Sequence, residues 1–290
     1  MAFLDPILEK KVNELKRELP NVTVDGRSLY VAEGDLLLEE AELPGYIPHA
    51  ANVETPNVPA GGAGQGLLGI EEDGKLLRWP EGRVLTYRVI ESTFESDEEH
   101  TRVCEGMAAA TGAWEATCGV AFRRVPDTDP PGDGAEDPLF TVRRFDAGGR
   151  FIASAFFPNS PPERRTVLID PSYFSSTLQF DPVGVLRHEL GHVLGFRHEH
   201  IRSGAPPVCR KESLDHTVDL TKYDPTSVMH YFCGRVGSRD LSITPLDREG
   251  AQTSMLREMK EVSLRAKGMA EADVQKAVAD AYKSGELRMP

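Results

Sequence analysis

The stretch HELGHVLGFRHEH, residues 188–200, decides how the rest of the chain is interpreted. His188 and His192 are four residues apart, so on a helix both imidazoles point the same way. Two nitrogens at this spacing can share one tetrahedral zinc ion. Glu189 lies beside them on the helix surface and can take a proton from a zinc-bound water without being a ligand itself.

The residues around this pair favour a catalytic zinc site. Asp181 and Pro182 are typical of a helix start, and Gly195 ends the helix with a positive φ that reverses the chain. His198 then returns as a third ligand, which leaves the fourth position open to water. The turn at Gly195 favours His198 over the nearby His200.

At this point the sequence resembles a known clan. Residues 188–200 look like the extended zinc motif of the metzincin metallopeptidases, and Glu199 after the third histidine resembles the astacin family in particular. Residues 227–231 (SVMHY) look like the astacin Met-turn. Looser likeness occurs at residues 78–80, 117–122 and 246–251, so the resemblance covers about residues 75 to 256.

The resemblance implies further roles. Met229 is expected to form an apolar floor beneath the zinc, and Tyr231 to be an additional metal ligand or a donor that stabilises the oxyanion. Without the motif, Met229 would be read as core and Tyr231 as a surface aromatic. Residues 151–157 would be a sheet-edge strand that holds an extended substrate by β-addition. The contacting residues of that strand are Ile152, Ala153, Ser154 and Ala155.

The pattern of elements favours an α+β fold or an α/β fold with a mixed sheet, and the resemblance implies a metzincin-like α+β domain. Strands are expected at residues 83–90, 120–125, 139–145, 151–157 and 167–169, with a long helix after Ser96. Further helices are expected after Thr244-Pro245 and at residues 271–282. A Gly- and Pro-rich stretch at residues 44–66 reads as a linker. We therefore divide the chain into a pro-segment, residues 1–74, and a peptidase domain, residues 75–290.

The N-terminal part is expected to keep the enzyme latent. Residues 32–35 (AEGD) resemble the Phe-x-Gly-Asp segment of astacin propeptides, with Ala32 in place of the phenylalanine. By that resemblance Asp35 ligates the zinc in place of water. Cleavage near Lys75 or Arg78 would release the block, and the new N-terminus would turn towards Glu199. The alternative is an ordinary turn in a small accessory domain.

Bulk properties exclude some partners. A net charge of −13 makes nucleic acid and anionic membranes poor partners. No apolar run approaches the roughly 18 residues of a membrane span. Residues 1–19 lack the apolar core of a signal peptide. The acidic loop at residues 126–138 could bind calcium, although a solvated loop is the favoured reading. The expected partner is a protein or peptide substrate, and a monomer is favoured.

Four cysteines permit two disulfides. We predict one between Cys209 and Cys233 and a second between Cys104 and Cys118, with four free thiols in a reducing compartment as the alternative. Paired cysteines and the family resemblance favour a secreted protein, although no signal peptide is seen in the chain.

The leading hypothesis is a zinc-dependent endopeptidase with Glu189 as general base. Two alternatives remain at this stage. One is a catalytically idle zinc-binding or adhesion module, against which Glu189 argues. The other is a zinc hydrolase that acts on a non-peptide substrate, which the motif alone does not exclude.

Overall fold

The computed structural model describes residues 6–47, 67–72, 75–126, 136–202, 204–209, 214 and 216–284. Most of the linker and most of the acidic loop lie outside these residues. Within them, none of the helices is both long enough and apolar enough to span a bilayer.

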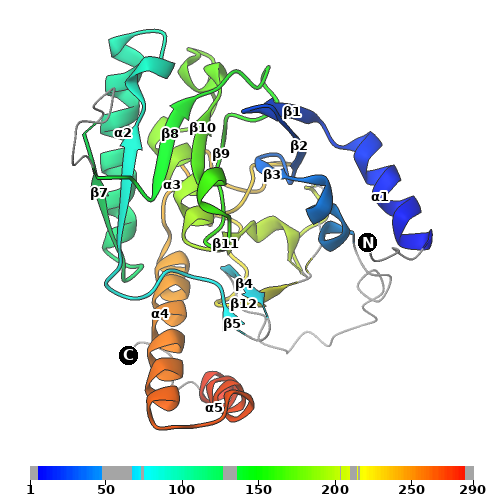
Figure 1. The fold of residues 1–290 in the computed structure, drawn as a ribbon, viewed down its shortest axis with the longest axis vertical. Helices are drawn as coiled ribbons and strands as arrows, with labels where there is room; N and C mark the ends of the chain where they lie inside the picture. The colour runs from blue at the N-terminus through cyan, green and yellow to red at the C-terminus, as the bar shows by residue number, and fades with distance from the viewer. Residues whose placement is uncertain are drawn as a thin grey trace.

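A five-stranded mixed sheet forms the centre of the molecule (Figure 1). Its strand order is β7 (Ala121–Arg124), β6 (Val84–Val89), β8 (Phe140–Arg144), β10 (Thr166–Ile169) and β9 (Ala153–Ser154). The first four strands are parallel, and β9 is the antiparallel edge strand. These strands confirm the expected ones. The strand expected over residues 151–157 is shorter, because only Ala153 and Ser154 pair with β10, opposite Ile169 and Leu168.

Two packed helices lie against the sheet and contribute to the main core. They are α2 (Asp97–Glu115) and α3 (Pro182–Val193). Ser96 caps α2 by accepting the Glu99 N–H at 3.2 Å. The Trp114 indole of α2 is fully buried and donates to the Arg187 carbonyl of α3 at 2.8 Å. This bond and the surrounding apolar packing fix the direction of the helix that bears the zinc motif.

A smaller sheet lies beside the end of α3. Its strands are β4 (Leu68–Glu72), β5 (Lys75–Leu76), β11 (Phe196–Arg197) and β12 (Thr217–Asp219). Strand β4 pairs with β11 on one side and with β12 on the other, and Leu67 just before it belongs to the main core. Residues 67–72 therefore pack with the zinc-motif part of the chain.

The N-terminal segment, residues 6–47, is a compact unit at one side of the main sheet (Figure 1). It contains α1 (Pro6–Glu18), β1 (Asn21–Val24), β2 (Arg27–Ala32), β3 (Leu36–Leu38) and the 3-10 helix η1 (Glu40–Tyr46). The expected break at Gly34 and Asp35 separates β2 from β3. One apolar cluster lies within the segment, and a second joins β1 and β2 to residues 147–168 of the main body.

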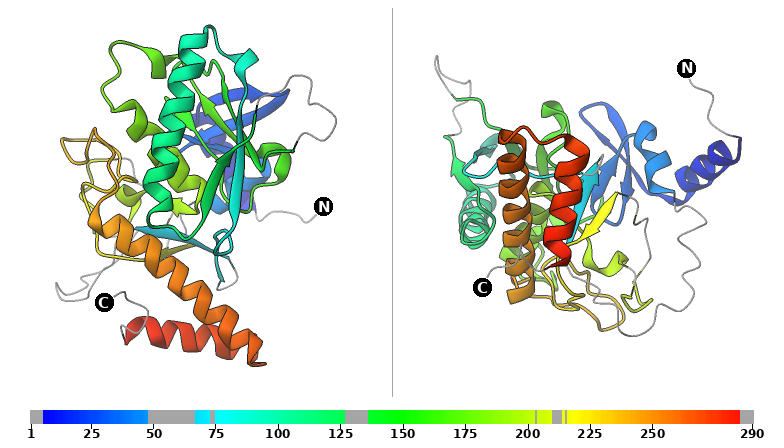
Figure 2. Two further views of the ribbon diagram at one scale, coloured as in Figure 1. Left: turned by 90° about the vertical axis from the view of Figure 1, so that its left-hand side faces the viewer. Right: turned by 90° about the horizontal axis from the view of Figure 1, so that it is seen from below.

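At the other end, α4 (Pro245–Ala266) and α5 (Glu271–Lys283) form a helical hairpin that projects from the body (Figure 2). Thr244 and Asp247 make a complete capping box at the start of α4. Short 3-10 turns complete the described elements: η3 (Glu91–Thr93), η4 (Pro162–Arg164), η5 (Pro171–Phe174) and η6 (Glu199–Ile201).

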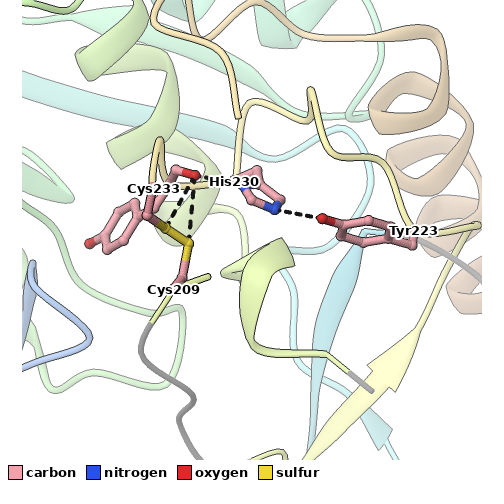
Figure 3. Close-up of a disulfide and its surroundings, with 5 residues drawn as sticks. Cys209, Tyr223, His230 and Cys233 are labelled. Atoms are coloured by element: carbon pink, nitrogen blue, oxygen red, sulfur yellow. Dashed lines mark hydrogen bonds between the residues drawn. A yellow bond between two sulfur atoms is a disulfide. The ribbon is translucent and has the colours of Figure 1, made fainter. Parts of the chain in front are cut away.

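One of the two predicted disulfides is correct. Cys209 and Cys233 are bonded, which ties the segment after the zinc motif to residues beyond the Met-turn (Figure 3). The predicted bond between Cys104 and Cys118 is wrong, because both are buried free thiols. Cys104 lies mid-way along α2 and Cys118 beyond its end. At 1.5 Å of rise per residue the remaining helix alone separates them by about 16 Å, whereas a disulfide needs Cα atoms within about 7 Å.

Candidate metal centre and active site

Three imidazoles converge at the C-terminal half of α3 and the turn that follows. His188 and His192 lie one helical turn apart, and Gly195 reverses the chain with a φ of +100°. A Cβ at Gly195 would lie 2.3 Å from the Leu77 carbonyl oxygen, so only glycine fits this turn. His198 then returns, so that its Nε2 lies 3.1 Å from that of His188 and 3.2 Å from that of His192.

The outer nitrogen of each imidazole faces an acceptor. Nδ1 of His188 donates to the Val228 carbonyl at 2.7 Å, and Nδ1 of His192 to the Phe196 carbonyl at 2.8 Å. Nδ1 of His198 lies 2.8 Å from a Glu33 carboxylate oxygen. Protons on Nδ1 leave lone pairs on the three Nε2 atoms, which point at one another. Such an arrangement is repulsive unless a cation lies between them, and it orients all three rings as metal ligands.

The N-terminal segment adds a carboxylate to this centre. An Asp35 oxygen lies 3.2 Å from Nε2 of His188 and 3.2 Å from Nε2 of His198, and its other oxygen lies 3.7 Å from Nε2 of His192. All four side chains are buried, and their donor atoms lie within 4.8 Å of one another. Tetrahedral ligands at 2.0–2.1 Å from zinc would be about 3.3–3.4 Å apart, so the set fits zinc.

Glu189 lies beside this centre without belonging to it. Its side chain is buried, and its Oε2 has no hydrogen-bond partner within the described part of the chain. Burial raises the pKa of Glu189 well above its usual range, and the neighbouring Asp35 carboxylate raises it further. The unpartnered oxygen is therefore available to a proton-bearing group at the metal site.

Tyr231 covers the centre from the side of the Met-turn. Its ring centroid lies 4.3 Å from that of His198 and 4.7 Å from that of His200. A Cβ on Gly34 would approach the Tyr231 hydroxyl to 3.0 Å, so glycine lets the chain before Asp35 pass beneath this ring. Burial raises the pKa of Tyr231, and the Asp35 carboxylate raises it further, so the hydroxyl stays protonated.

Met229 is fully buried directly beneath the motif helix. A Cβ on Gly191 would lie 2.2 Å from the Met229 sulfur, so the glycine lets the thioether contact the helix backbone between the two histidines. The backbone carbonyl of Met229 also accepts from the Glu199 N–H at 2.9 Å. The Met-turn is thereby held against both sides of the histidine motif.

Glu199 itself is fully buried away from the metal centre. One of its oxygens accepts from Arg202 Nη1 at 3.1 Å and from the Asp224 N–H at 2.9 Å, whereas Oε2 has no partner within the described residues. Burial raises the pKa of Glu199 to about 8, in spite of the Arg202 charge. Oε2 of Glu199 can therefore accept a hydrogen bond from one more donor.

The predicted substrate strand lies at the edge of the main sheet, where the N-terminal segment contacts it. Ala153 and Ser154 form β9, the Ile152 carbonyl accepts from the Asp170 N–H at 2.9 Å, and Ala155 bridges to Leu36 of the N-terminal segment in a parallel sense. A cavity of about 340 Å³ lies next to Glu189 and is bordered by apolar side chains of both walls, including Ile152, Val185, Phe232 and Leu241.

The structure brings together the four residues that the sequence placed at the metal, Asp35, His188, His192 and His198, and leaves His200 and His230 outside this group. His230 instead contacts the Tyr223 hydroxyl at 2.9 Å (Figure 3). The sequence alone did not point to Glu33 or Arg197 as residues of this site. These two residues form a buried ion pair beside His198, although they are 164 residues apart in the chain. Burial raises the pKa of Glu33, but the charge of Arg197 and the hydrogen bond from His198 lower it to about 2.

Comparison with known proteins agrees with this geometry. The sequence profile of the matrixin family matches residues 78–233, more than half of the chain. No curated protein matches the sequence. Among solved structures, myroilysin is 16% identical, with a TM-score of 0.44, over 64% of this chain and 97% of its own. The zinc protease high choriolytic enzyme 1 of the medaka fish Oryzias latipes is also 16% identical, with a TM-score of 0.34, over 67% and 95%. On the strength of the profile match, which contains the three histidines and the Met-turn, the chain belongs to the matrixin family of zinc metallopeptidases, with a metzincin-type α+β fold.

Proposed function

We propose that this protein is an astacin-like zinc endopeptidase whose N-terminal segment holds it latent. The observation that carries the proposal is the convergence of three Nε2 atoms and the Asp35 carboxylate, with the Glu189 carboxylate buried beside them. His188, His192 and His198 are the proposed protein ligands of one zinc ion.

When bound, zinc supplies a Lewis acid that polarises the scissile carbonyl and lowers the pKa of a water to near neutral. Glu189 is the proposed general base. It accepts the proton of the attacking water on its spare oxygen and later passes it to the leaving amine.

Tyr231 is the proposed donor to the oxyanion. Its hydroxyl stays protonated, and its ring lies against His198 at the centre. A donor in this place stabilises negative charge as it develops on the carbonyl oxygen. Ile152 to Ala155 would hold the substrate backbone by β-addition, and the apolar cavity beside Glu189 would receive a substrate side chain next to the scissile bond.

The latency proposal rests on the position of Asp35. Its carboxylate lies where a fourth zinc ligand belongs, and carboxylate oxygen is a normal zinc ligand, so it would exclude the water nucleophile. Leu36 meanwhile bridges to the edge strand that a substrate would use. Glu33 anchors the same turn through Arg197 and His198. One turn of the N-terminal segment thus blocks both the metal and the substrate strand.

Activation would then require cleavage of the chain. The pairing of β4 with β11 favours a release point before Leu67 rather than at Lys75 or Arg78, because residues 67–72 are part of the smaller sheet. The unpartnered Oε2 of Glu199 suits a newly formed ammonium group that turns inward. The Cys209–Cys233 bond suits a secreted protein, since disulfides persist in oxidising compartments.

The proposal is tested with casein and the purified chain before and after limited proteolysis. We expect digestion only after processing, and its loss with a zinc chelator. In the intact chain, Asp35→Ala should raise activity well above the parent, while Glu40→Ala, which removes a pair with Lys16 inside the same segment, should not. A processed, zinc-loaded protein that leaves casein and gelatin intact contradicts the endopeptidase. Equal activity of intact parent and Asp35→Ala contradicts the latency.

A further inference from the structure

Three ion pairs join the N-terminal segment to the peptidase body, and in each of them the body supplies the positive charge and the segment the negative charge. Arg143, Arg164 and Arg197 belong to the body, and each pairs with a carboxylate of the segment. The pairs are Arg143 with Asp25 at 2.6 Å, Arg164 with Glu42 at 2.8 Å, and Arg197 with Glu33. Five of these six side chains, all except that of Glu33, border one cavity of about 450 Å³. In a chain of net charge −13, the body side of this cavity is nevertheless net positive, because its three arginines outnumber Glu72 and Glu163.

This cavity lies along the proposed substrate strand. Ser154 to Phe157 border it, whereas Ile152 and Ala153 border the apolar cavity beside Glu189. The two cavities therefore receive different stretches of a chain that follows the strand. Asp35, at the metal, borders the apolar cavity, and Leu36 to Leu38 border the basic one.

Arg197 is the most strongly organised of the three arginines. It lies in β11, where it pairs with Leu68 of β4, and directly precedes the third histidine. Its residue is only 5% exposed. Its guanidinium lies over the Tyr46 ring at 5.2 Å and contacts both carboxylate oxygens of Glu33. Arginine stays charged at any working pH, and its planar group suits a carboxylate held by two oxygens.

Glu33 occupies the position that a substrate side chain would take once the segment has left. Glu33 is two residues from Asp35, the residue at the metal. A substrate side chain that replaced the Glu33 carboxylate would therefore belong to a residue close to the scissile bond. We propose that Arg197 is a specificity-determining residue that selects substrates with an aspartate or glutamate within two residues of the scissile bond, on the side over Ser154 to Phe157. Arg164, farther along the same cavity, adds a second preference for acidic side chains. This inference rests on the proposed endopeptidase activity.

The test uses the full chain activated by limited proteolysis and a set of quenched fluorescent peptides. The peptides share one cleavable core and carry Glu, Gln or Lys in turn at each of the three positions on either side of the scissile bond. We expect one position, within two residues of the bond and on one side only, where Glu raises kcat/KM over Gln by about tenfold or more and Lys lowers it. Raised salt should reduce this ratio, since the outer part of the cavity is open to solvent.

Variants assign the effect to Arg197. In Arg197→Gln the Glu-to-Gln ratio of kcat/KM should fall to near one, and Arg197→Lys should keep part of it. Each ratio is internal to one enzyme, so a general loss of activity does not alter it, and zinc content checks the integrity of the centre. If Arg197→Gln does not fold, the Glu-to-Gln ratio of kcat/KM is compared between the parent and Arg197→Lys. A ratio that is unchanged in Arg197→Lys then contradicts the inference.

The outcomes separate this inference from the proposed function. Cleavage without any acidic preference, or a preference that Arg197→Gln retains, overturns the inference and leaves the endopeptidase intact. A failure to cleave every peptide and casein overturns the endopeptidase, and the inference falls with it. A preference confined to positions bound in the apolar cavity also overturns the inference.

Discussion

The buried pair of Glu33 and Arg197 allows the free energy with which the N-terminal segment docks on the body to be tested by mutation. In Glu33→Ala the segment would dock with Arg197 and His198 Nδ1 both left without this carboxylate. The Glu33 side chain is fully buried and that of Arg197 is 6% exposed, so the pair belongs to the buried class. Removing one member of such a pair costs about 3–5 kcal/mol. At about 1.4 kcal/mol per factor of ten, the docking equilibrium would weaken roughly 140- to 3,700-fold.

Two measurements on the intact, unprocessed chain test this estimate. Casein activity of Glu33→Ala should rise by about two orders of magnitude or until it reaches the level of the processed enzyme. Amide hydrogen exchange in β2 and β3 should accelerate by a similar factor. The matched control is Glu40→Gln, because Glu40 pairs with Lys16 inside the segment and is 64% exposed. It should leave both readouts unchanged.

Zinc content is measured alongside, because loss of a partner of a ligating histidine can weaken metal binding by 10- to 100-fold. The assays therefore run with zinc in slight excess. If zinc-loaded Glu33→Ala is no more active and exchanges no faster than Glu40→Gln, the pair does not hold the segment and the reasoning is refuted.

Other consequences are open to direct measurement. Glu189→Gln should keep its zinc and fold but lose nearly all peptidase activity after processing, and comparable turnover in the zinc-loaded variant would rule out the general-base role. The pKa of Glu33 lies at about 2 in the docked state against 4.5 for the free group, so its contribution is present above pH 4.5 and is lost as the pH falls towards 2. Acid should thus loosen the segment in the parent, as seen by hydrogen exchange, and Glu33→Gln should lack this component; equal acid responses of the two proteins would contradict the assignment. Alkylation without reductant should label none of the four cysteines in the folded protein, and after unfolding only Cys104 and Cys118. Labelling of Cys209 or Cys233 in the unfolded, unreduced chain would show that their bond is absent.

The three histidines of the metal centre were predictable because they lie close together in the sequence. His188, His192, Gly195 and His198 lie within eleven residues, and the helical period and one glycine turn bring three nitrogens together. The caps at Ser96 and Asp181 are also local, and both are made as expected. Helix and strand positions follow from the same short-range patterns.

The contacts that sequence reasoning missed join distant segments. Glu33 and His198 are 165 residues apart, and nothing near either residue indicates the other. The prediction of a Cys104–Cys118 bond was based on the spacing of the cysteines in the chain, and it neglected the length of the helix between them. Strand β4 was missed because the Gly- and Pro-rich run before it suggested that everything upstream of residue 75 belonged to the pro-segment. Its membership in a sheet depends on partners at residues 196–197 and 217–219.

Strand β4 also matters for anyone who prepares shortened versions of this protein. The matched region begins at residue 78, which invites expression of a fragment that starts there. Such a fragment would lack the strand that pairs with both β11 and β12. Both would then present unpaired backbone N–H and C=O groups, which other copies can pair with, so aggregation is the expected failure. The strand that directly precedes His198 would also lose its support. Recombinant fragments should therefore begin no later than Leu67.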